Sequence, residues 1–274
     1  LLDGSASVSG EVRIGDAAKK QVSQDVSFVS ATPTTKSGNY EIKITTAAEK
    51  AAVAASQKQE DVLARAETLS INGVQVNLDA GLSQAQVAAR INEFSSQTGV
   101  AAAINAESGT TLLTTIRYGS AAKIVVQSSA EASVTSTGFG KIKQSDAGVD
   151  IAGTIGGQAA IGNENFLTVA TGDAAGLRLA VQGQADAIRT VSGDQGTVTV
   201  KNNALTFQIG ANVSHTASVA LAIATTKALG TGSSRQFDNL GAIDLTNSAN
   251  AGEALKVIDH AINQISSARG ELGA

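Results

Sequence analysis

Residues 247–274 carry an apolar repeat that a chain can bury only against other helices. Apolar residues recur at steps of 3 and 4, the spacing of a helix seam. The seam consists of Leu255, Ile258, Ile262, Ile265 and Leu272, with Arg269 interrupting the same stripe. Val257 and Ala261 widen the stripe, and Asn247 or Ser248 can cap the helix. We therefore expect one long helix with partners on more than one side, some of them helices outside this chain.

Composition excludes several classes of protein. The 274 residues include no Cys, so disulfide scaffolds, Cys-ligated metals and thiol nucleophiles are excluded. A net charge of −4 disfavours nucleic-acid binding, and no apolar run approaches the roughly 20 residues of a membrane-spanning helix. The chain also has no Met, which leads us to expect a fragment of a longer protein.

Motifs for catalysis and cofactor binding are absent from the sequence. It contains no GxSxG elbow, HExxH pair, P-loop or GxGxxG fingerprint. His215 follows Ser214, but neighbouring residues on a strand point to opposite faces and cannot form a nucleophile–base pair directly. His260 falls between seam positions, where a solvated or interfacial histidine is expected. We expect no catalytic residue, no cofactor and no metal, and hence no enzyme.

Residues 67–129 are predicted to form a compact α+β module. Two alternating runs in 68–78 are separated by Asn72-Gly73, a dipeptide typical of a type I′ hairpin turn. A helix is predicted from the cap Ser83 to about Gln97, ended by Gly99. Strands are predicted over 100–104, 111–116 and 123–127.

The flanking regions are mostly β as well. Residues 39–45 alternate as a half-buried strand does, and 149–209 contain short runs separated by glycines, typical of meander hairpins. Residues 47–66 are rich in Ala, Gln and Lys and fit either a helix or a linker. The overall fold class predicted is α+β, a helical core segment carrying a β-rich region with a small α+β module.

Three segments, at residues 254–274, 205–212 and 1–5, together resemble parts of bacterial flagellin. Residues 254–274 resemble the carboxy-terminal core helix of that family, and 205–212 are similar to its strand beside the core helices. Residues 1–5 resemble the segment that follows its long amino-terminal helices. The resemblance implies that Phe207, Ile209 and Asn212 belong to a core strand.

Two further segments are similar to modules of the outward region of such proteins. Residues 69–74, 87–92 and 99–104 resemble the repeat module shared by flagellins and hook-associated proteins. Residues 150–157 resemble a stretch of the filament cap protein.

The spacing of these segments predicts three domains, of which two are inserted. Residues 1–7 and 205–274 would form the flagellin-like core (D1-like). Residues 8–66 and 130–204 would form a β-rich inserted domain (D2-like), and 67–129 the α+β module (D3-like). An insertion into an existing turn needs ends that lie close together, so we expect Ser7 to lie near Leu205.

The resemblance implies a secreted, self-assembling structural subunit of the extracellular bacterial flagellar filament, supporting motility. The implied partners are other flagellin subunits, an export chaperone and the filament cap protein, with no nucleic acid and no membrane insertion. We expect the C-terminal seam, with Arg269, to make core and assembly contacts, although packing within the chain explains it equally well. If the helix is well packed, Ile262→Ala should cost about 2–5 kcal/mol. The alternatives are a cap or hook-associated protein and a surface adhesin module.

Overall fold

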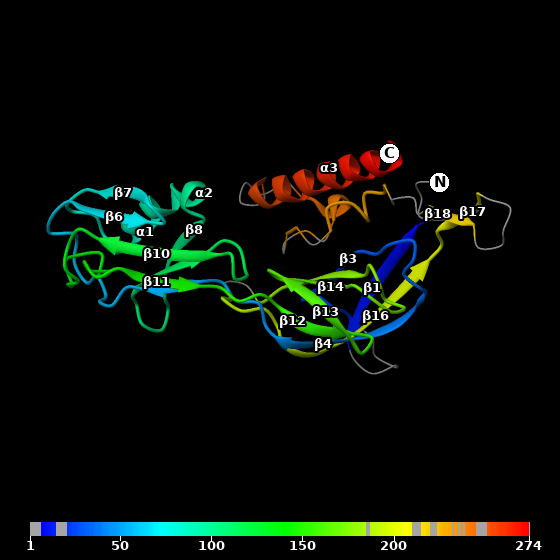
Figure 1. Cartoon of the computed structure of the whole chain (residues 1–274). Coiled ribbons are helices and arrows are strands. Elements are labelled where there is room, and N and C mark those ends of the chain that lie inside the picture. The colour runs from blue at the N-terminus through cyan, green and yellow to red at the C-terminus, as the bar shows by residue number, and fades with distance from the viewer. Residues whose placement is uncertain are drawn as a thin grey trace.

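The computed structural model describes residues 7–14, 21–184, 187–209, 215–219, 224–231, 233–234, 237, 239–244 and 251–273. The chain is mostly β with a few helices, in agreement with the coarse α+β class. Among the described residues, the buried side chains form three separate hydrophobic clusters. Figure 1 shows the corresponding parts: a smaller module at one end, a large sheet at the other, and a C-terminal helix alongside that sheet.

The large sheet has nine strands, and all its hydrogen-bonded pairs are antiparallel. Its order is β2-β1-β16-β4-β12-β13-β14-β15-β3. The strands are β1 (Val8–Ile14), β2 (Gln21–Val22), β3 (Val26–Ser30), β4 (Gly38–Thr46), β12 (Ala152–Ile155), β13 (Gln158–Asn163), β14 (Phe166–Val169), β15 (Arg178–Val181) and β16 (Gly193–Asn202). The predicted strand over 39–45 is confirmed as β4, and the predicted meander as β12 to β15.

The sheet curls so that β1 and the edge strand β3 face each other. Gly10 on β1 has no room for a side chain, because a Cβ atom there would clash with the ring of Phe28 on β3. Alternate residues of β4, Tyr40, Ile42 and Ile44, are buried in the enclosed core. Period-2 alternation therefore places one face of each strand inside the curl.

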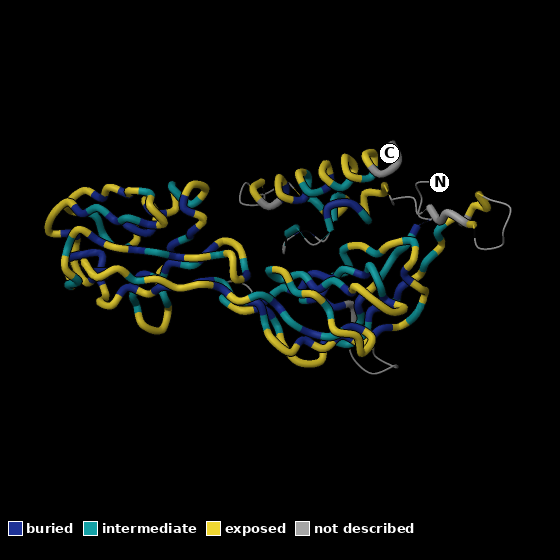
Figure 2. Tube along the Cα trace, viewed as in Figure 1, coloured by how far each residue is buried: buried dark blue, intermediate teal, exposed yellow. Residues whose placement is uncertain are grey.

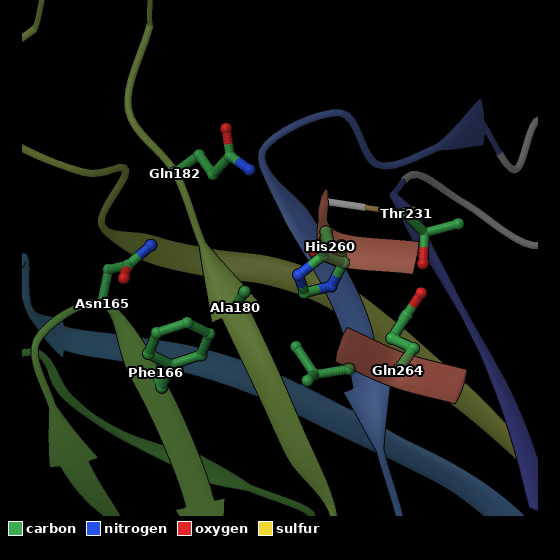
Figure 3. Close-up of a pocket in the computed structure, with 9 residues that line it drawn as sticks. Asn165, Phe166, Ala180, Gln182, Thr231, His260 and Gln264 are labelled. Carbon is green, nitrogen blue, oxygen red and sulfur yellow. The ribbon is translucent and has the colours of Figure 1, made fainter. Parts of the chain in front are cut away.

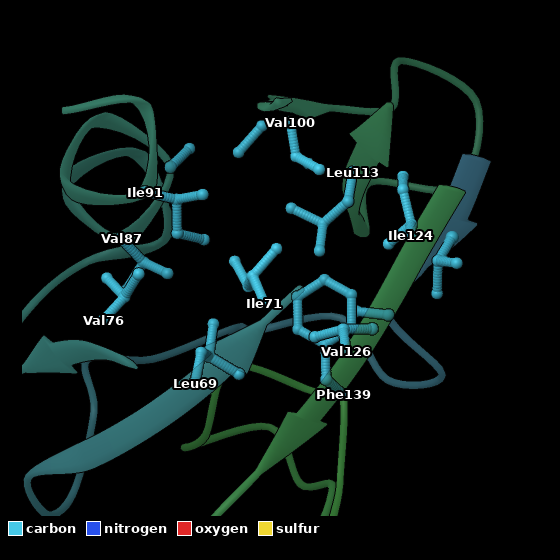
Figure 4. Packing of buried hydrophobic residues seen from close by; sticks show 14 of the residues in the cluster. Leu69, Ile71, Val76, Val87, Ile91, Val100, Leu113, Ile124, Val126 and Phe139 are labelled. Atoms are coloured by element: carbon cyan, nitrogen blue, oxygen red, sulfur yellow. The ribbon is translucent and has the colours of Figure 1, made fainter. Parts of the chain in front are cut away.

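The smaller module packs two sheets and two short helices around one core (Figure 4). The sheet orders are β11-β10-β6-β7 and β5-β9-β8. The elements are β5 (Ala52–Ala54), β6 (Glu67–Ile71), β7 (Val74–Leu78), α1 (Gln84–Asn92), α2 (Ser95–Thr98), β8 (Val100–Ile104), β9 (Thr111–Thr115), β10 (Lys123–Ser128) and β11 (Gln144–Ala147). The predicted hairpin is confirmed, since Asn72 and Gly73 have φ of 50° and 86°.

The helix predicted over 83–97 is wrong in its length. Helix α1 ends at Asn92, and the short α2 follows after a turn, ending at Gly99 with φ of 70°. The side chain of Asn92 accepts a hydrogen bond from the Ala102 nitrogen (2.7 Å) and donates one to the Ala102 oxygen (2.9 Å). These bonds tie the end of α1 to β8. The turn that follows lets Phe94 pack against the core.

Residues 47–66 are neither a helix nor a free linker. They contribute the short strand β5 and buried side chains, including Ala51 and Leu63, to the core of the smaller module. Backbone hydrogen bonds join 56–64 to 134–138, and Phe139 is buried in the same core. This core therefore extends beyond the residues 67–129 that the sequence assigns to the module.

The remaining elements follow β16 in the chain. Strands β17 (Leu205–Gln208) and β18 (Thr216–Val219) form a two-stranded sheet, η1 (Leu240–Ala242) is a single 3₁₀ turn, and α3 spans Ala251–Gly273. The capping residues proposed for α3, Asn247 and Ser248, lie outside the described residues.

The ends of residues 8–204 lie side by side, as the insertion hypothesis requires. Val8 pairs with Asn202, and the Asn203 nitrogen donates to the Ser7 oxygen at 2.9 Å. The division into D1-, D2- and D3-like domains itself stays a prediction.

Candidate assembly surfaces

Helix α3 buries one narrow face within the chain. Ala254, Val257 and Ala261, spaced by 3 and 4 residues, are buried. This face packs against Phe237, with Leu240 and Ile243 at its border. Val257 and Ala261, which the sequence places beside the seam, therefore belong to the face that packs α3 against the rest of the chain.

The predicted seam lies on the neighbouring, exposed side of α3. Leu255, Ile262 and Ile265 are 59%, 55% and 42% exposed, and Ile258 is half-buried at the boundary. Arg269 is exposed on the same stripe, whereas the side chain of Leu272 lies outside the described residues. Figure 2 shows this outer side of α3 as a run of exposed turns. We call Leu255, Ile258, Ile262 and Ile265 the α3 stripe.

A second apolar surface lies on strand β17 and the residue after it. Leu205, Phe207 and Ile209 alternate along the strand, and each is exposed, Ile209 to 71%. Because alternate residues of a strand share a face, these three side chains form one apolar row. A two-stranded hairpin on its own is marginally stable in water, so we expect another structural element to pack over this row. Asn212, the third predicted core-strand residue, lies outside the described residues.

A close contact between Gly230 and α3 helps to hold the helix in position, and no periodic pattern in the sequence predicts it. The nitrogen of Gly230 donates to Oε1 of Gln264 at 2.7 Å. Gly230 has φ of 75°, and a side chain there would clash with Val257. Only glycine combines this backbone conformation with such a close approach. The sequence signal available was the Gly-Thr-Gly run at 230–232.

Between α3 and the large sheet lies a hollow lined by both polar and apolar side chains (Figure 3). His260, Gln264 and Thr231 face Phe166, Asn165 and Gln182 of the sheet side across it. Burial lowers the pKa of His260 below its ordinary value of 6.5. His260 therefore occupies an interface, one of the two positions expected for it.

Among the residues that the structure describes, no cluster of three or more His, Asp or Glu side chains could hold a metal ion. His215 is exposed, and its carbonyl oxygen accepts the Ile209 nitrogen at 2.8 Å. In the described ranges, no helix is both long and apolar enough to cross a lipid bilayer.

The smaller module has a recognisable family signature. Residues 68–116, which run from the β6–β7 hairpin to the end of β9, match the flagellin hook IN motif. The chain thus carries a flagellin-related module, as the sequence resemblance predicts. The motif relates the chain to structural proteins of the flagellum.

Two solved structures resemble the chain more weakly, and both are FliD proteins. FliD (HAP2) from Pseudomonas aeruginosa PAO1 is 16% identical, with 62% of this chain and 82% of that chain covered and a TM-score of 0.33. The flagellar cap protein FliD from Bdellovibrio bacteriovorus is 13% identical, with 65% and 96% covered and a TM-score of 0.38. No curated protein matches the chain. Such TM-scores indicate only a partial resemblance.

Proposed function

We propose that this chain belongs to a structural subunit of the bacterial flagellar filament, a non-enzymatic protein that assembles outside the cell. The observation that carries the proposal is the exposed α3 stripe, which occurs in a chain with a flagellin hook IN motif. A helix that buries one face within its own chain and leaves an apolar stripe exposed is built for contact on two sides.

The α3 stripe fits a partner helix. Its residues recur at 3, 4 and 3, so they form a continuous seam along one side of α3. In the proposal, helices outside this chain cover the seam, within the same subunit and from neighbouring subunits. Contacts of this head-to-tail kind do not close on themselves and extend into a helical filament. Further subunits, an export chaperone and the cap protein are the proposed partners.

The large sheet and the smaller module would then face outward. Their cores are complete within residues 8–204, and the ends of that segment meet at Ser7 and Asn203. An insert of this kind leaves the helical part of the subunit free to pack with its neighbours.

The experiment that tests the proposal is electron microscopy of the full-length parent protein under polymerising conditions, comparing wild type with two variants. Ile262→Asp places a charge in the α3 stripe, and Asn263→Asp places the same charge at the adjacent exposed position. We expect long filaments from wild type and Asn263→Asp, and none from Ile262→Asp. Equal assembly by both variants would remove the α3 stripe from the interface.

A filament cap or hook-associated protein is the second candidate, and the hook IN motif favours it. The same micrographs separate the two functions. Closed rings, or stubs confined to filament tips, would assign the chain to a cap or junction protein instead of the filament subunit.

A further inference from the structure

The tip of the β6–β7 hairpin holds the only Asn-Gly step in the chain, at Asn72-Gly73. Both residues are exposed, and nothing lies near the position where a Gly73 side chain would be. Asn-Gly steps are chemically labile, because an unhindered glycine nitrogen can attack the preceding side-chain amide. The attack requires that the Asn side chain turn back toward its own backbone.

In the folded module, three hydrogen bonds hold the side-chain amide of Asn72 in place. Its Nδ2 donates to the carbonyl oxygens of Thr98 and Lys123, both at 2.9 Å. Its Oδ1 accepts the backbone nitrogen of Val125 at 2.8 Å. One side chain thereby joins the hairpin turn to the end of α2 and to strand β10.

We propose that Asn72 is a deamidation site controlled by folding, protected in the native module and reactive whenever the module unfolds. In the reaction, a bond forms between the Gly73 nitrogen, which gives up its proton to solvent, and Cγ of Asn72. The Cγ–Nδ2 bond breaks, and ammonia leaves after taking a proton from solvent. Water then opens the resulting succinimide to aspartate or isoaspartate, so the net change is one water consumed and one ammonia released.

The three side-chain hydrogen bonds set the size of the protection. All three must break before the amide can rotate toward Gly73. At the typical net strength of a hydrogen bond, three together correspond to a retardation of about a hundredfold.

The product cannot restore the native contacts. A carboxylate has no hydrogen to donate, so it would place negative charge against the Thr98 and Lys123 carbonyl oxygens. An isoaspartate would also lengthen the backbone inside a two-residue turn whose φ angles must both be positive. A chain modified while unfolded would therefore refold into a less stable module.

The test compares deamidation rates of the native protein and of the same protein in guanidinium chloride at mildly alkaline pH. Trypsin releases residues 66–90 by cleavage after Arg65 and Arg90, and this peptide contains Asn72 and the control Asn77, which precedes Leu78. Fragmentation in the mass spectrometer assigns the modified residue. We expect Asn72 to react about a hundredfold faster in the denaturant than in the native protein. Equal rates in the two states, or equal reaction of Asn77 in the denaturant, would overturn the proposal.

A matched pair of variants tests the consequence for stability. Asn72→Asp and Asn77→Asp introduce the same charge at two exposed positions of one hairpin, and Asn77 only accepts a bond from the Thr68 hydroxyl. We expect a lower denaturation midpoint for Asn72→Asp than for Asn77→Asp. Identical midpoints would show that the amide donors do not stabilise the module.

Discussion

The backbone nitrogen of Asn203 donates a 2.9 Å hydrogen bond to the carbonyl oxygen of Ser7 and so joins the two ends of a long segment. From there, β1 and β16 run antiparallel as neighbours, with Val8 opposite Asn202. Both large hydrophobic clusters lie between these ends. The segment thus contains all the residues of both clusters.

We predict that residues 7–203 fold when produced alone. Because two closed cores and their paired ends are retained, cooperative thermal unfolding should persist. Circular dichroism and calorimetry of this segment and of the whole chain provide the measurement. A segment without a cooperative transition would show that the cores depend on residues beyond Asn203.

The two faces of α3 should respond differently to truncation. Val257 is fully buried, so Val257→Ala should cost about 1–3 kcal/mol in the packing of α3. Ile262 is 55% exposed, so Ile262→Ala should cost about 1 kcal/mol or less in this chain, below the range expected for a well-packed seam. Hydrogen exchange of the α3 amides measures both changes. A larger loss for Ile262→Ala would reverse the assignment of the faces.

Glu67 is a buried carboxylate that holds a loop to the smaller module. It accepts hydrogen bonds from the hydroxyls of Ser128 and Thr137 and from the Thr137 nitrogen at 3.0 Å. Glu67→Ala leaves these buried donors without their acceptor and should lower the free energy of unfolding by about 2–4 kcal/mol. Guanidinium titration gives the value. The exposed Glu107→Ala in the same module is the control, and a similar loss there would contradict the role of Glu67.

The docking of α3 should depend on pH through His260. Burial lowers the pKa of His260 in the folded state below 6.5, so the neutral form is favoured there. Between the folded pKa and 6.5 the undocked state binds more protons, and docking should therefore strengthen as pH rises through this window and level off above it. Exchange of the α3 amides across this range provides the test.

The His260→Gln variant should lose this pH dependence, because it removes the titrating group. His215→Gln, at an exposed position outside α3, should retain it. An unchanged pH profile in His260→Gln would assign the effect to another group.

Local signals in the sequence predicted much of the smaller module. The positive φ angles of Asn72 and Gly73 and the end of α2 at Gly99 follow from residue types that favour these conformations. The break after Asn92 could not be predicted in this way. It depends on a hydrogen-bonded contact with Ala102 on β8, a strand formed later in the chain.

The sequence also located the apolar positions of α3 without telling which of them the chain buries. Periodicity identifies the rows that contain Val257 and Ile262 but carries no information on what each row touches. That choice depends on Phe237 and Gly230, which are distant in sequence and belong to no periodic pattern. The limits of the smaller module could not be predicted from local patterns either. Leu63 joins the core of this module by packing against residues that are distant in sequence.

The smaller module is inserted between two neighbouring strands of the large sheet, and the segment that contains both has its own ends paired. This nesting determines how the chain would respond to a pulling force. Thr46 pairs with Ala152 where the smaller module leaves the large sheet, just as Val8 pairs with Asn202 where the sheet leaves the rest of the chain. A force pulling residues 7 and 203 apart would open the β1–β16 pair one hydrogen bond at a time, starting from its outer end. The tension would reach the smaller module only after β4 and β12 had separated. This module would therefore be the last part of the segment to bear a force applied at residues 7 and 203.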